Sequence, residues 1–188
     1  MVSSKALIAT ALLQSAVPTP SQPLDLNSKL INKPASEWIA YGPDQTTKLL
    51  PNAGPQGYPA YEVTVTKAGR NAWDDGAVSV VPKPIKAGDV ILIAFYLREP
   101  GLADGQTETL PLVGATGATA PYVAIASAPA TITNQWKLYF ASGKATQAFP
   151  AAGAQATVHL ASARHTIQVG PVRVYDFGPD FDIGRLPH

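Results

Sequence analysis

The residues best suited to chemistry gather in one short stretch, RNAWDDG, at positions 70–76. Arg70, Asn71 and Asp74 carry planar hydrogen-bonding groups, and Trp73 offers a flat apolar ring. A sugar needs both kinds of side chain, because a pyranose ring presents C–H bonds on its face and paired hydroxyls at its edge. The stretch therefore indicates a carbohydrate-binding edge. The alternative is a turn in which Asn71 and Asp74 cap the backbone while Trp73 closes the end of a core.

Further candidates lie on the polar phase of three predicted strands, 89–98, 135–140 and 155–160. Alternation places Tyr96 and Arg98 on this phase in the first strand, Tyr139 in the second and His159 in the third. The opposite, apolar phase holds Ile91, Ile93, Phe95 and Leu97, then Trp136, Leu138 and Phe140, then Val158 and Leu160. If the three strands share a sheet, the polar phases form one groove. If they do not, these are ordinary solvated faces.

The elements that must position these side chains are strands. Short runs with a period of two recur after Glu37, separated by Gly, Pro, Asn or Asp, and the chain holds 15 Gly and 18 Pro. The nine predicted strands are 38–42, 61–66, 78–80, 89–98, 109–113, 121–127, 135–140, 155–160 and 166–177, with loops at 114–120 and 141–154. Without a convincing amphipathic helix, this pattern predicts an all-β fold, a β-sandwich of the jelly-roll type over residues 37–188.

Bulk composition removes several classes of function. The chain has 14 Lys and Arg against 13 Asp and Glu, so no net field favours nucleic acid or an anionic membrane. Cysteine is absent, which excludes disulfides, thiol nucleophiles and cysteine-ligated metals. No stretch of the sequence reaches the roughly 18 apolar residues of a membrane span.

The N-terminal region resembles a targeting segment. Lys5 precedes an apolar run at 6–13, and small residues and prolines follow it. This order predicts a secretory signal peptide over 1–21, a Pro- and Ser-rich linker over 22–36, and a secreted or periplasmic protein. A disordered or weakly helical tail is the alternative.

Enzyme motifs are missing from the sequence. The histidines show no H-E-x-x-H or H-x-H spacing, and there is no G-x-S-x-G elbow. Several carboxylates are present, but none forms a paired site that the sequence can identify. We therefore predict a protein that is not an enzyme and needs no cofactor.

The order of the pieces resembles a known family. An N-x-W-D turn at 71–74 is followed by IKAGDVILIAFYLR at 85–98, NQWKLYF at 134–140 and IQVGPVRVYDF at 167–177. This order is similar to that of jelly-roll carbohydrate-binding modules with a galactose-binding-like β-sandwich, of the xylan- and glucan-binding kind. The resemblance covers residues 37–177.

The resemblance implies a function and a metal. It implies non-catalytic binding of a β-linked plant-type polysaccharide or oligosaccharide, with Arg70, Asn71, Trp73, Asp74, Tyr96, Arg98, Tyr139 and His159 as candidate ligand-binding residues. It also implies a structural calcium ion, for which Glu62 and Asp176 are the candidates. The alternative from another class is a secreted structural or protein-interaction sandwich without a sugar site.

Overall fold

The computed structural model describes residues 25–34 and 37–187, and its regular secondary structure is almost entirely β-strand. Ten strands follow one another along the chain: β1 (Ile39–Tyr41), β2 (Gln45–Leu50), β3 (Ala60–Val65), β4 (Gly76–Val81), β5 (Val90–Arg98), β6 (Glu108–Gly117), β7 (Ala124–Ile132), β8 (Lys137–Lys144), β9 (Ala154–His159) and β10 (His165–Asp176). The helical elements are short: α1 (Leu26–Lys29), η1 (Pro55–Gly57) and η2 (Ile183–Arg185).

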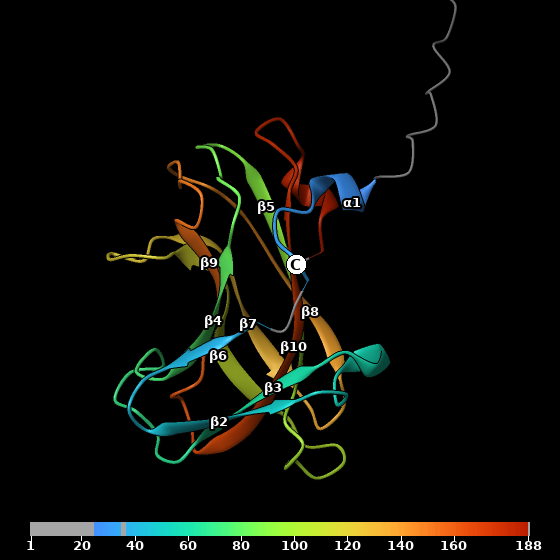
Figure 1. The fold of residues 1–188 in the computed structure, drawn as a ribbon, viewed down its shortest axis with the longest axis vertical. Coiled ribbons are helices and arrows are strands. Elements are labelled where there is room, and N and C mark those ends of the chain that lie inside the picture. The colour runs from blue at the N-terminus through green and yellow to red at the C-terminus, as the bar shows by residue number, and fades with distance from the viewer. Residues whose placement is uncertain (1–24, 35–36, 188) are drawn as a thin grey trace, which may run out of the picture.

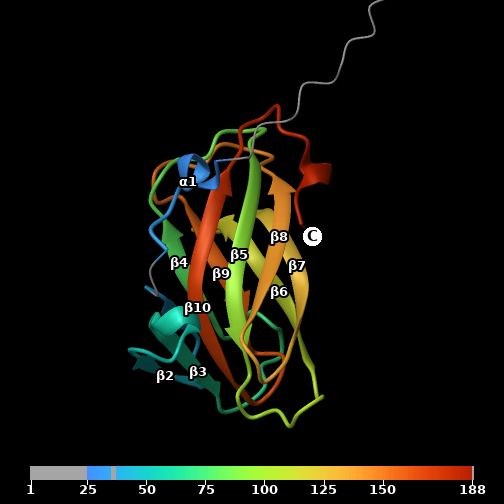
Figure 2. The ribbon, with the colours of Figure 1, turned by 90° about the vertical axis from the view of Figure 1, so that its right-hand side faces the viewer.

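The strands form two five-stranded antiparallel sheets. One, here sheet A, has the order β2-β3-β10-β5-β8, and the other, sheet B, has the order β1-β4-β9-β6-β7. Figure 1 shows the sandwich with its strands labelled, and Figure 2 shows β10, β5 and β8 in front of β9, β6 and β7. The chain crosses repeatedly between the sheets, so strands distant in sequence become neighbours. The predicted all-β sandwich is confirmed.

The core lies between the sheets and follows the alternation of the sequence. On β5 the inward side chains are Ile91, Ile93, Phe95 and Leu97, each fully buried. On β9 the inward positions are Ala154, Ala156 and Val158. The inward phase continues beyond Leu97 to Glu99, which is also buried. Burial and the neighbouring Glu108 carboxyl raise the pKa of Glu99 to about 8.

Some predicted boundaries need correction. β2 was not predicted, because its sequence, QTTKLL, is mostly exposed and carries little apolar alternation. β6 continues through 114–117 and β8 through 141–144, both of which were assigned to loops. Their small residues allow close packing: a Cβ at Gly143 would lie 2.0 Å from the Ile125 carbonyl oxygen of β7. Small side chains here therefore reflect contact between strands.

The predicted phase of β8 was wrong. Tyr139 pairs with Phe95 and packs against the core, whereas Leu138 pairs with Tyr96 on the outward face. Phe140 also points outward, where it packs against a second apolar cluster made of Val90, Leu92, Ala94, Tyr175, Phe177 and Leu186. A strand that meets apolar surroundings on both faces loses the alternation from which its phase could be predicted.

Segments near the first and last described residues pack onto this outer cluster of sheet A. Leu30 and Phe181 contact it, and the rings of Phe177 and Phe181 lie 4.5 Å apart. Ile31 donates a backbone hydrogen bond to Val174, and the buried Asn32 side chain donates to Val172 at 2.9 Å. Part of the segment assigned to the linker is therefore attached to the sandwich. The predicted signal peptide, 1–21, lies outside the described residues.

Among the residues that the structure describes, no helix is long and apolar enough to cross a membrane.

Candidate functional site

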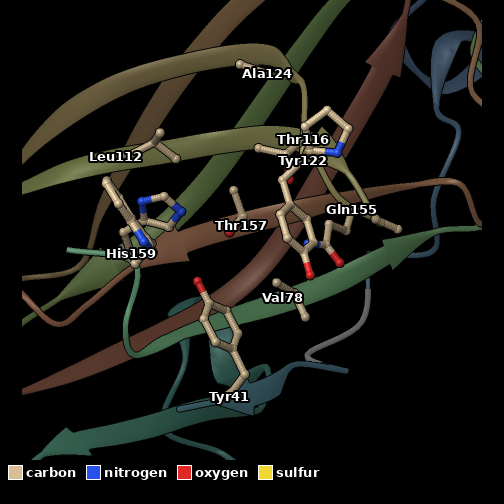
Figure 3. Close-up of a pocket in the computed structure, with 12 residues that line it drawn as sticks. Tyr41, Val78, Leu112, Thr116, Tyr122, Ala124, Gln155, Thr157 and His159 are labelled. Atoms are coloured by element: carbon tan, nitrogen blue, oxygen red, sulfur yellow. The ribbon is translucent and has the colours of Figure 1, made fainter. Parts of the chain in front are cut away.

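A groove crosses the outward face of sheet B. Its volume is about 650 Å³, within the usual range for ligand sites. All five strands of the sheet, or the loops next to them, contribute to a lining made of Tyr41, Trp73, Val78, Leu112, Thr116, Ala118, Pro121, Tyr122, Ala124, Gln155, Thr157 and His159. Figure 3 shows Tyr41, Tyr122 and His159 projecting into the same space, with Thr157 on the strand between them.

The polar floor comes from alternate residues of β9. Ala154, Ala156 and Val158 point into the core, so Gln155, Thr157 and His159 point outward into the groove. The Thr157 side chain is hydrogen-bonded to Tyr41, and burial raises the pKa of the Tyr41 phenol. The ring of Tyr41 lies over Gly76, where a Cβ would approach its hydroxyl oxygen to 2.5 Å. Glycine at this position therefore leaves room for the Tyr41 ring.

Some residues of the stretch at 70–76 form a turn, and one of them lines the groove. The Asn71 backbone N–H donates to Asp74 at 2.9 Å, and the Asn71 side-chain amide donates to the other oxygen of the same carboxylate. These hydrogen bonds lower the pKa of Asp74. Arg70 and Asp74 line a separate shallow depression that includes Lys67. Asn71 and Asp74 thus cap the turn, as the alternative reading of the sequence held.

Trp73 is the residue of this stretch that reaches the groove. It is 59 % exposed, so it does not close the end of the core. Its ring meets the imidazole of His159 edge-on, with the ring centres 6.3 Å apart. Exposure of the apolar indole ring to water is unfavourable, so a ligand whose apolar surface covers the ring gains binding free energy.

Tyr122 stands at the other end of the lining, in the loop between β6 and β7. It is 58 % exposed and has φ of +53°. This left-handed conformation costs a non-glycine residue roughly 1–2 kcal/mol, and such strain tends to occur where function fixes a side chain. Its backbone N–H donates to Thr119 at 2.8 Å, which closes the turn that aims the ring.

The other three predicted ligand-binding residues lie on sheet A, so the three strands do not share a sheet and their polar phases do not form one groove. The Arg98 guanidinium donates to Gln168 at 2.7 Å and lies 4.8 Å from the centre of the Trp136 ring. The Tyr139 hydroxyl donates to the carbonyl of Thr131. Tyr96 is partly buried on β5. Sequence alternation cannot show which strands share a sheet.

The two calcium candidates do not fit one ion. Glu62 is paired with Gln168 on β10 and accepts a hydrogen bond from its amide at 2.6 Å. Asp176 lies eight residues further along β10, which corresponds to about 26 Å of extended strand. Asp176 instead accepts from the backbone N–H of Gly178. Residues this far apart cannot ligate the same cation.

Sequence reasoning missed Tyr41, Tyr122 and Gln155. A signal existed for Gln155, which shares the phase of Thr157 and His159 on β9. Tyr41 and Tyr122 follow from no local pattern, because their positions depend on the order β1-β4-β9 and on the loop before β7. Long-range pairing, which one sequence does not reveal, brings them to the groove.

His159 predicts a pH dependence for this site. Burial lowers the pKa of its imidazole, so the ring is neutral at neutral pH. As the pH falls, His159 of the unfolded chain is protonated near pH 6.5, before His159 of the folded protein. Acidification below that value therefore lowers the stability of the fold.

We expect binding of a neutral ligand to be constant from about pH 8 to about pH 6.5 and to weaken below, because the ligand would cover a charged imidazole. Calorimetric titrations across this range, with His159→Gln as the insensitive control, check the expectation; affinity that rises on acidification contradicts it.

Comparison with known proteins agrees on the fold. No family model matches the chain. No curated protein matches it in sequence. Among solved structures, the CBM22-1 xylan-binding domain of Xyn10C from Paenibacillus barcinonensis has a TM-score of 0.53 at 12% identity, over 80% of this chain and 92% of that one. The second N-terminal cellulose-binding domain of β-1,4-glucanase C from Cellulomonas fimi has a TM-score of 0.52 at 18% identity, over 84% and 97%.

A longer protein contains a similar unit. The CBM22-1–GH10 modules of xylanase 10B from Clostridium thermocellum, in complex with xylohexaose, match with a TM-score of 0.55 at 17% identity. The match covers 80% of this chain and 29% of that one, so the present chain spans less than a third of that structure. The chain therefore has the β-sandwich fold of xylan- and cellulose-binding carbohydrate-binding modules.

Proposed function

We propose that the protein binds a neutral β-linked polysaccharide in the groove of sheet B and does not cleave it. The observation that carries the proposal is the lining itself, in which the rings of Tyr41, Trp73 and Tyr122 accompany the hydrogen-bonding groups of Gln155 and Thr157. Aromatic rings cover the C–H face of a sugar, while hydroxyl and amide groups exchange hydrogen bonds with its edge. The fold shared with xylan- and cellulose-binding modules supports the same ligand class.

The lining favours an uncharged ligand. Among the described residues, those that line the groove include no Asp, Glu, Lys or Arg, and burial keeps His159 neutral at neutral pH. A uronate or sulfate group would leave water without meeting a cation here, which is unfavourable. Val78, Leu112 and Ala124 add apolar surface to the lining beside the polar residues of β9. Neutral xylan, mixed-linkage glucan and cellulose oligosaccharides therefore suit the groove better than pectin-like polymers.

The same lining supports binding without hydrolysis. Glycoside hydrolysis generally requires two carboxyl groups on either side of the scissile bond. The groove, over the part of the chain that the structure describes, is lined by none. We expect no release of reducing ends when the protein is incubated with the glycan that it binds.

We also expect the protein to lie outside the cytoplasm, where it would meet such a polymer. Cytoplasmic protein that retains Met1 would contradict this expectation.

Affinity electrophoresis against a panel of polysaccharides tests the function. We expect retardation by neutral xylan or mixed-linkage glucan, and dissociation constants for their oligosaccharides in the micromolar to millimolar range, equivalent to roughly 4–8 kcal/mol. The weakness has a physical cause, since each sugar hydroxyl exchanges a bond to water for one to protein and gains only about 1 kcal/mol. Polygalacturonate and carboxymethylcellulose serve as charged comparisons. Retention on these alone, or on no glycan at all, would refute the proposal and leave a protein-interaction role.

A further inference from the structure

Three polar side chains point into one end of the core, where apolar residues would be expected. Glu99 continues the inward phase of β5 after Leu97, and Glu108 opens the inward phase of β6. His165 begins β10 in the same phase as the buried Ile167. Glu99 and His165 thus come from sheet A and Glu108 from sheet B. The three residues face one another across the interior of the sandwich.

Their ligating atoms lie close together and away from water. One oxygen or nitrogen from each side chain lies within 4.8 Å of the other two. The Nδ1 atom of His165 is hydrogen-bonded to an oxygen of Glu108 at 2.5 Å, a contact that a bound metal ion would have to replace, and the side chains of these residues are 1% and 22% exposed. Glu99 as a whole is 7% exposed. This is a buried cluster, in contrast to the exposed acidic groups common on protein surfaces.

The cluster leaves polar atoms without partners. Over the described residues, Oε2 of Glu99 and Nε2 of His165 are buried and have no hydrogen-bond partner. Native structures satisfy most buried polar atoms, so an orphaned atom calls for an explanation such as an unseen water or ion. Two carboxyl groups held side by side also repel unless a proton or a cation lies between them. A cation in place of the proton would satisfy the two orphaned atoms and neutralise both carboxylates.

We propose that Glu99, Glu108 and His165 form a binding site for Zn²⁺ that ties sheet A to sheet B. One imidazole and two carboxylates suit zinc, whereas calcium prefers six to eight oxygen ligands. Three protein ligands leave one position for water, which can enter beside the partly exposed Glu108. The cluster faces the core, while the groove lies on the outward face of sheet B. The site therefore acts on stability, independently of the proposed glycan binding.

Isothermal titration of the chelator-treated full chain with ZnCl₂ tests the site, together with thermal unfolding. We expect one Zn²⁺ bound per chain and, at a hundredfold excess over Kd, a melting temperature raised by roughly 5–10 °C. Glycan affinity should be the same with and without the metal. Co²⁺ in place of Zn²⁺ should give visible absorption bands characteristic of its coordination.

Matched Glu→Gln variants locate the ion. Glu99→Gln and Glu108→Gln should each weaken Zn²⁺ binding at least tenfold and abolish the thermal shift. Neither substitution changes side-chain shape, and both relieve carboxylate repulsion in the metal-free protein, so both variants should fold. Glu62→Gln, in which the amide oxygen can still accept from Gln168, should retain full binding. Zinc binding that survives unchanged in both cluster variants, or no stoichiometric binding, overturns the proposal and leaves a cluster that holds only protons.

Discussion

Replacing both Trp73 and Tyr122 by alanine is expected to weaken glycan binding about a hundredfold or more. Each ring is more than half exposed in the unliganded protein, and each would be covered by a sugar. Loss of one such aromatic contact should cost about 1.4 kcal/mol, equivalent to tenfold in the dissociation constant. The two rings do not depend on each other in the structure, so their effects should add. Calorimetry with the oligosaccharide that the panel identifies measures both single variants and the double variant.

Stability measurements distinguish lost binding from lost folding. Because both side chains are exposed, the free energy of unfolding should change by no more than about 0.5 kcal/mol for Trp73→Ala. Tyr122→Ala keeps the left-handed backbone and should behave similarly. The control is Tyr96→Ala, on β5 of the other sheet, which should bind the glycan as the unmodified protein does. If Tyr96→Ala weakens binding as much as Trp73→Ala, the ligand lies elsewhere than in the groove.

The fold could be predicted because its main signal is local. Period-two alternation and the spacing of Gly and Pro identify strands without knowledge of their partners. The inward residues of β5 and the outward Thr157 and His159 of β9 followed directly from this rule. The rule failed for β2, which is an exposed strand, and for β8, whose outward Phe140 packs under the C-terminal segment.

The site could be predicted only in part, because it depends on which strands are neighbours. Trp73 and His159 were found by residue type and phase, and the structure brings them together. Arg98 and Tyr139 satisfied the same criteria, yet they lie on sheet A and use their polar atoms within the protein. Tyr41 reaches the groove only because β1 pairs with β4 at Gly76. Such pairings are decided by the packing of the whole sandwich.

The packing of the sandwich should be most sensitive to shortening of the side chain at Phe95. Its side chain is fully buried at the middle of β5, the strand between β10 and β8. It is paired with Val172 on one side and Tyr139 on the other. Its ring stacks on Trp38, with centres 6.3 Å apart, and the Trp38 indole donates a hydrogen bond to Gly170. Phe95 therefore connects the segment before β1 to the central strands of sheet A.

Phe95→Ala is expected to lower the free energy of unfolding by about 3–5 kcal/mol, measured by urea denaturation. Removal of the ring loses its transfer free energy and leaves a cavity that rigid neighbouring strands cannot fill. For a domain of this size the melting temperature should fall by roughly 6–20 °C. Phe95→Leu, which fills most of the space, should lose less, while Leu138→Ala, 38% exposed on the adjacent strand, should change stability by no more than about 0.5 kcal/mol. A loss under about 1 kcal/mol for Phe95→Ala would mean that the sandwich relaxes around the gap, contrary to the close packing argued here.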